Sequence, residues 1–108
     1  MATDKEYMEF IAGQLSEAGI ITYRKMFGEY GVYCDGIFFG TVEDNQLYIK
    51  ITAGGAMFMP NAVIASPHEG AKYFLIDELE DKEFLKNIIR ITCSELPLPK
   101  ARKNRKQL

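Results

Sequence analysis

The sequence predicts an α+β domain: a two-layer sandwich in which an antiparallel sheet of four to five strands carries helices on one face. Between residues 24 and 51, three strand-like runs follow one another with only short turns between them, which is typical of an antiparallel meander. An amphipathic helical pattern precedes this meander and another closes the chain. The chain has 108 residues, 47% of them hydrophobic, so it can bury one core without disulfides or metals.

The first helix is expected over residues 4–18. Thr3 and Glu6 match a capping box, in which the two side chains satisfy backbone N–H groups at a helix start. Gly19 is the type of residue that ends a helix. The apolar stripe at three- and four-residue spacing comprises Met8, Ile11, Leu15 and Ala18.

The meander is defined by its turns. A short strand over residues 20–23 leads into the run MFG at 26–28, whose glycine predicts a bulge or a tight bend. Asp35 and Gly36 tolerate the positive φ angles of a two-residue hairpin turn, and a second turn is expected at 44–45.

Side-chain alternation in the meander predicts an aromatic patch on the face without helices. Phe38 and Phe39 are neighbours, so one of them faces the helices and the other lies on the opposite face; which one remains open. We expect a second copy of the chain to cover this patch, forming a homodimer. The alternatives are the 53–59 region folding back, or unpaired bases stacking on the tyrosines. The expected dimer face comprises Tyr33, Phe38, Phe39 and Tyr48.

The second half of the chain supplies the remaining elements. Residues 52–60 are consistent with a turn and one or two helical turns, and 72–76 with a final strand that pairs with 62–64. Asp81 can cap the closing helix, which Pro97 stops. The buried stripe of that helix comprises Phe84, Leu85, Ile88, Ile89, Thr92 and Leu96.

Charge divides the chain into a domain over residues 1–98 and a basic flexible tail over 99–108. The tail holds five of the 13 lysines and arginines, so the rest has eight basic and 15 acidic residues and a net charge of −7. Nucleic acid could contact the tail, although we favour a solubilising role because the body repels phosphates. The candidate nucleic-acid contacts are Lys100, Arg102, Lys103, Arg105 and Lys106.

Two features favour a cytoplasmic protein with no membrane partner. The N-terminus is acidic where a signal peptide needs positive charge, and no apolar run approaches the ~20 residues of a membrane span. Cys34 and Cys93 form no CxxC pair and are too few for a disulfide framework, which indicates a reducing compartment.

No catalytic or metal-binding set is evident. His68, the single histidine, lies in a Pro- and Gly-flanked loop with Glu69 as the nearest acid in sequence, and a solvated loop histidine is favoured over a general base. One histidine and two separated cysteines do not make a zinc site. Gly28 and Gly31 lack the following helix of a phosphate cradle. We therefore expect no enzyme activity, metal or cofactor.

The runs MFGEYGVYCDG, LYIK and GAKYFLIDELEDKEFL resemble the N-terminal domain of the TfoX/Sxy family, proteins associated with regulation of natural competence in bacteria. Asp35 and Gly36 match the hairpin turn of that family. The family's regulators carry a second, helical domain, whereas this chain ends in PLPKARKNRKQL, so a stand-alone N-terminal domain is expected. The signature residues are Met26, Phe27, Gly28, Tyr30 and Gly31.

The resemblance implies an α/β sandwich and a non-enzymatic regulatory or protein-interaction role, and it supplies no catalytic residues. Two alternatives stay open. One is a small-ligand-binding protein with a pocket near MFGEYG, His68 and the Gly54-Gly55 turn. The other is a nucleic-acid-binding module that uses the basic tail.

Overall fold

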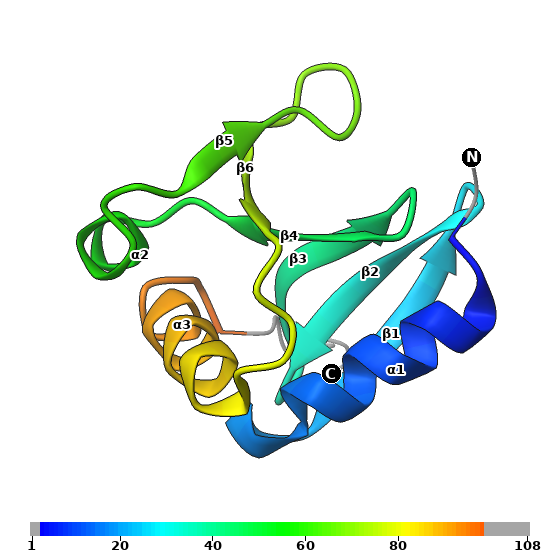
Figure 1. The fold of residues 1–108 in the computed structure, drawn as a ribbon, viewed down its shortest axis with the longest axis horizontal. Coiled ribbons are helices and arrows are strands. Elements are labelled where there is room, and N and C mark those ends of the chain that lie inside the picture. Colours follow the sequence, from blue (N-terminus) through cyan, green and yellow to red (C-terminus); the bar gives the residue numbers. More distant parts are fainter. Residues whose placement is uncertain (1–2, 99–108) are drawn as a thin grey trace, which may run out of the picture.

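The computed structural model describes residues 3–98 and has the predicted two-layer α+β architecture (Figure 1). The sheet is antiparallel with strand order β1-β2-β3-β4-β6-β5, so it has six strands where four to five were expected. The predicted tail contacts, Lys100, Arg102, Lys103, Arg105 and Lys106, lie outside the described residues. In chain order the elements are α1 (Lys5–Leu15), the 3₁₀ helix η1 (Ser16–Ala18), β1 (Ile21–Met26), β2 (Glu29–Cys34), β3 (Ile37–Glu43), β4 (Gln46–Lys50), α2 (Ala53–Phe58), β5 (Val63–Ala65), β6 (Tyr73–Ile76) and α3 (Lys82–Ser94).

Three two-residue turns join the first four strands. The turns at 35–36 and 44–45 are confirmed, and both residues of each have positive φ, as this type of hairpin requires. The third turn is Phe27 and Gly28, with φ of 51° and 83°, where the sequence predicted a bulge or bend. Residues 21–26 therefore form a full strand instead of a short one, because this turn folds them back onto β2.

The bulge lies elsewhere, in β3. Opposite Val32 stands Gly40 and opposite Tyr33 stands Phe38, so Phe39 is the extra residue in the ladder. The side chain of Phe39 is fully buried on the helix side, whereas Phe38 packs against Tyr33 on the other side with ring centroids 5.3 Å apart. This answers which of the two phenylalanines faces the helices.

Helices α1 and α3 cover one face of the sheet, and in Figure 1 they lie along the lower side of the strands. The core between the layers includes large side chains from both, and all of the following are less than 2% exposed: Met8, Ile11, Leu15, Val32, Phe39, Val42, Leu47, Ile49, Leu85, Ile88 and Ile89. We call the sheet face opposite the helices the open face. Within residues 3–98, no helix is long and apolar enough to cross a membrane.

The two long helices differ in how they begin. The Asp81 cap of α3 is confirmed, because its Oδ1 accepts a hydrogen bond of 3.0 Å from the backbone N–H of Phe84. The capping box of α1 is wrong: Asp4 is the N-cap and its side chain makes no capping bond. The Thr3 hydroxyl instead donates to Glu29 Oε1 at 2.6 Å and accepts from the backbone N–H of Asn45 at 3.1 Å, so its oxygen is directed at the β3–β4 turn and not at the start of α1.

Candidate functional site

A cavity of about 540 Å³ lies on the open face, between the β1–β2 turn and the loop that joins β5 to β6. It brings together the MFGEYG run and His68, which are about 40 residues apart in the sequence. The Gly54-Gly55 segment is not part of this cavity. The Gly54 N–H donates to the carboxylate of Glu95, and the Gly55 N–H donates to the hydroxyl of Thr52, which caps α2. The lining residues are Met26, Phe27, Glu29, Tyr30, Phe38, Thr41, Glu43, His68 and Tyr73.

The signature residues shape one wall of this cavity. A Cβ on Gly31 would lie 2.7 Å from Met26 Cε and 3.1 Å from Phe38 Cε1, so the bare glycine lets these two side chains close over the sheet. The Tyr30 ring lies on the other side of the sheet, in the core beneath the helices, where it packs edge-on against Tyr23 with ring centroids 5.5 Å apart. The motif is therefore a packing arrangement around a cavity and not a phosphate cradle.

Phe27 is unusual in both backbone and exposure. It takes the first position of its turn at positive φ, where the other two turns use Asp35 and Asp44. A bulky residue in this conformation costs about 1–2 kcal/mol, whereas aspartate tolerates it. The Phe27 side chain is also fully exposed, so no packing offsets the cost. Strain without local compensation is characteristic of functional positions.

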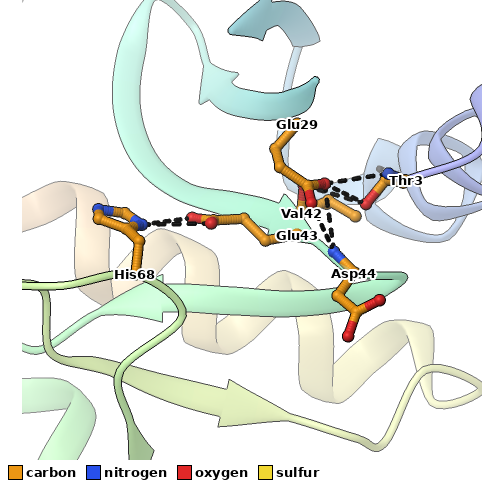
Figure 2. A network of polar contacts seen from close by, with 6 residues as sticks. All are labelled: Thr3, Glu29, Val42, Glu43, Asp44 and His68. Atoms are coloured by element: carbon orange, nitrogen blue, oxygen red, sulfur yellow. Dashed lines mark hydrogen bonds and ion pairs between the residues drawn. The ribbon is translucent and has the colours of Figure 1, made fainter. Parts of the chain in front are cut away.

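The opposite wall carries a carboxylate and an imidazole in contact. His68 Nδ1 lies 2.9 Å from Glu43 Oε2, and as the hydrogen-bond donor it points at a carboxylate whose side chain is only 12% exposed (Figure 2). From the sequence, Glu69 was only the nearest acid and a solvated loop histidine was favoured; His68 is half-exposed but contacts Glu43. Glu43 was missed because it stands 25 residues away, at the end of β3, and only the return of the β5–β6 loop brings the two together.

A second carboxylate on the same face is held rigidly. Glu29 accepts hydrogen bonds from the Thr3 hydroxyl and backbone N–H at 2.6 and 3.1 Å, and from the Asp44 backbone N–H at 3.1 Å (Figure 2). Burial, together with the nearby Glu43 carboxylate, raises the pKa of Tyr73. Burial and the charges of Glu43, Asp44 and Glu29 raise that of Tyr48 in the same way. Carboxylates therefore lie close enough to these two tyrosines to disfavour their ionisation.

One buried hydroxyl in the cavity lining has no partner. Thr41 is 4% exposed and stands on β3 between Tyr48 on β4 and Gly31 on β2, which places its side chain on the open face. Its Oγ1 makes no hydrogen bond to any of residues 3–98. Leaving a buried hydroxyl unpaired costs roughly 1–3 kcal/mol, so hydrogen bonding does not explain a threonine here. Among residues 3–98 the other such hydroxyl is that of Thr92, which lies on α3 and away from the cavity.

The cysteines lie on the helix side and are not activated. Burial raises the pKa of Cys34, and burial together with the adjacent Cys34 raises that of Cys93 to about 12. A thiol that stays protonated is a poor nucleophile and a poor metal ligand. Among residues 3–98, no three His, Cys, Asp or Glu side chains converge in a way that could hold a metal ion.

A second surface of interest is the β5 edge of the sheet. Val63 and Ile64 of β5 are 59% and 57% exposed, and Met57 of the preceding helix α2 is 84% exposed. Phe58 and Val63 line a hollow of about 410 Å³ next to this edge. We call Met57, Phe58, Val63 and Ile64 the edge patch.

The residues predicted to form a dimer face differ in exposure. Tyr33 and Phe38 are partly exposed on the open face. Phe39 is buried under the helices, which agrees with the expectation that one of the two phenylalanines lies on that side. Tyr48 lies on the open face but is only 8% exposed. The aromatic surface there is therefore smaller than the sequence indicated.

The sequence comparisons agree with this picture. The model of the TfoX N-terminal domain matches residues 13–95. The chain belongs to the TfoX N-terminal domain family. A relative from Spirochaeta aurantia, described as an uncharacterized 12.7 kDa protein in the trpE 5′ region, is 36% identical over 105 residues, covering 95% of this chain and 91% of the relative. The signature run at residues 26–31 of this TfoX N-terminal domain is the one that walls the cavity.

Proposed function

We propose that this TfoX N-terminal domain is a non-enzymatic regulatory or protein-interaction module that acts as a homodimer formed through the β5 edge. The observation that carries the proposal is the difference between the two edges of the sheet. The β1 edge displays Arg24 and Lys25, which discourage pairing with another strand. The β5 edge displays the uncharged run Val63–Ala65 with its two exposed aliphatic side chains.

The geometry of β5 suits pairing with a second copy. Val63 pairs with Leu75 and Ile64 with Phe74, so Val63 lies on the open face and Ile64 on the helix face. Antiparallel pairing of two β5 strands about a two-fold axis would place the same residues on both sides of the contact. The exposed side chains of Val63 and Ile64 would then each lie beside apolar side chains of the second β5 strand, and both would lose contact with water.

The area required brings α2 into the interface. A stable interface buries about 800 Å² on each partner, which is more than a three-residue strand supplies. Met57 and Phe58 project from α2, five to six residues before β5, and are 84% and 40% exposed. Phe58 stacks on Phe84 with ring centroids 5.8 Å apart, which holds it in place as an anchor.

The absence of an activated nucleophile among the described cavity residues supports a non-enzymatic role. Both thiols have raised pKa values, no serine, cysteine or lysine lines the cavity, and the Thr41 hydroxyl that does line it makes no hydrogen bond to His68. Nucleophilic catalysis needs such a group within hydrogen-bond reach of a base. The exposed apolar edge, by contrast, is a feature of association.

Light scattering coupled to gel filtration tests the dimer. The wild-type chain of 12.3 kDa is expected to elute with twice that mass at micromolar concentration. Ile64→Lys puts a charge on the β5 edge, as β1 already has, and should give a monomer. Thr22→Lys makes the same change on the β1 edge and should leave the dimer intact.

Two outcomes would contradict the proposal. A wild-type mass near 12.3 kDa across the whole peak would remove the homodimer. A dimer that withstands Ile64→Lys but is lost in a folded Tyr33→Glu, Phe38→Glu variant would place the contact on the open face.

A further inference from the structure

We propose that the open-face cavity binds a small organic cation: a protonated amine or a quaternary ammonium group attached to an aromatic or compact apolar body. This site is separate from the edge patch, and the inference does not rest on dimerisation. A volume of about 540 Å³ is within the usual range of small-molecule sites, and apolar walls with a few polar groups are their usual composition.

Charge decides the class of ligand. Among the described residues that line the cavity, the carboxylates are Glu29 and Glu43 and there is no lysine or arginine, although the ammonium of Lys50 lies against the ring of Phe38. Glu43 is largely shielded from solvent and, within residues 3–98, receives a hydrogen bond only from His68, whereas Glu29 already has three donor groups. A poorly solvated carboxylate with few donors is stabilised by a nearby cation and repels an anion.

The aromatic walls favour an organic cation over a metal ion. Phe27, Phe38 and Tyr73 line the cavity, and ring faces attract ammonium groups with roughly 0.5–2 kcal/mol each. The fold already shows this interaction, because the Lys50 ammonium lies 4.5 Å from the centroid of Phe38. A metal ion would instead require a set of several oxygen ligands.

Two features that stability does not explain fall on this site. Phe27 is strained and fully exposed at the rim, where it can fold onto an entering ligand. Thr41 lines the cavity with a buried hydroxyl that lacks a partner among residues 3–98, and a χ1 rotation would offer it to the ligand. Both residues gain a role if an amphipathic cation binds between the turn and the His68 loop.

The test is an amide NMR titration of the full chain with benzyltrimethylammonium chloride. We expect saturable shifts of the backbone amides of Phe27, Phe38, Thr41 and His68. Phenylacetate and benzyl alcohol present a similar ring with negative or no charge, and should cause no saturable shift below about 10 mM. Binding of either control as tightly as the cation would overturn the proposal, as would the absence of saturable shifts with the cation.

Matched variants locate the charge. Glu43→Gln removes the carboxylate at nearly constant shape and should weaken binding of the cation about tenfold. Glu69→Gln makes the same change one residue from His68 but outside the lining, and should leave the affinity unchanged. Equal weakening in both variants would mean a general charge effect and would refute the site.

A second variant covers the case in which Glu43→Gln fails to fold, which the same spectra reveal. Phe38→Leu keeps both carboxylates and removes one ring, and should weaken binding of the cation about threefold. If the affinity of Phe38→Leu for the cation is unchanged, the aromatic rings do not contribute to binding, and the proposal that the cavity binds an organic cation is refuted.

Discussion

Phe38 and Phe39 are neighbours in the chain, yet they lie on opposite faces of the sheet and in different environments. Phe39 is fully buried between the sheet and the helices, in a core made almost entirely of apolar side chains. Phe38 is partly exposed beside a cavity that also contains carboxylates, an imidazole and an unpaired hydroxyl. The helix side is packed with apolar side chains, among which the Thr92 hydroxyl also lacks a partner within residues 3–98. The open face combines such a hydroxyl with carboxylates, an imidazole and a cavity, which is why we assign binding to it.

The largest expected difference between the faces is at these two phenylalanines. Phe39→Ala should destabilise the fold by about 3–5 kcal/mol, since it empties a packed core that cannot collapse. Phe38→Ala should cost about 1–2 kcal/mol, because its site is already partly open to water. Urea unfolding followed by circular dichroism measures both. Equal losses would show that the open face is packed like the core.

Two glycines of the sheet give the next contrast. A Cβ on Gly40 would strike the backbone carbonyl oxygen of Tyr48 on the adjacent strand, so Gly40→Ala should cost about 3 kcal/mol. A Cβ on Gly31 would meet only the ends of Met26 and Phe38, which can move toward the cavity. Gly31→Ala should therefore cost about 1 kcal/mol. Thermal unfolding compares them, and a larger loss for Gly31→Ala would contradict a yielding cavity wall.

The layers and most elements could be predicted from the sequence because local patterns encode them. Apolar periodicity gave both long helices, Asp81 gave the α3 cap, and the turn residues at 35–36 and 44–45 gave two hairpins. The third hairpin was missed because a phenylalanine stands where turn chemistry calls for Asp, Asn or Gly.

The site was less predictable because it depends on distant contacts. The bulge at Phe39 follows from the register with β2; the adjacent Gly40 is a local sign, because a glycine inside a strand often marks a bulge, but it does not say which residue is the extra one. The Glu43–His68 contact joins residues 25 positions apart through a loop with no regular pattern. Thr3 was assigned to a helix cap, yet its hydroxyl donates to Glu29, which belongs to the β1–β2 hairpin. The spacing of apolar residues predicts which face of the sheet a side chain occupies, but it does not predict which residues of a distant loop will contact that side chain.

The smallest expected effect, and the only gain in stability, is at the β1–β2 turn. Phe27→Asn should stabilise the fold by about 0.5–1 kcal/mol, because asparagine tolerates positive φ and the exposed ring contributes no packing. The reverse change, Asp44→Phe in the β3–β4 turn, should lower the free energy of unfolding by a similar amount, because the backbone conformation is the same.

If the cavity binds an organic cation, Phe27→Asn should also weaken that binding, so stability and affinity would change in opposite directions. Urea unfolding and the amide titration, applied to both variants, separate the two effects. A loss of stability in Phe27→Asn would mean that the ring supports the fold, and the strained turn would then need no functional explanation.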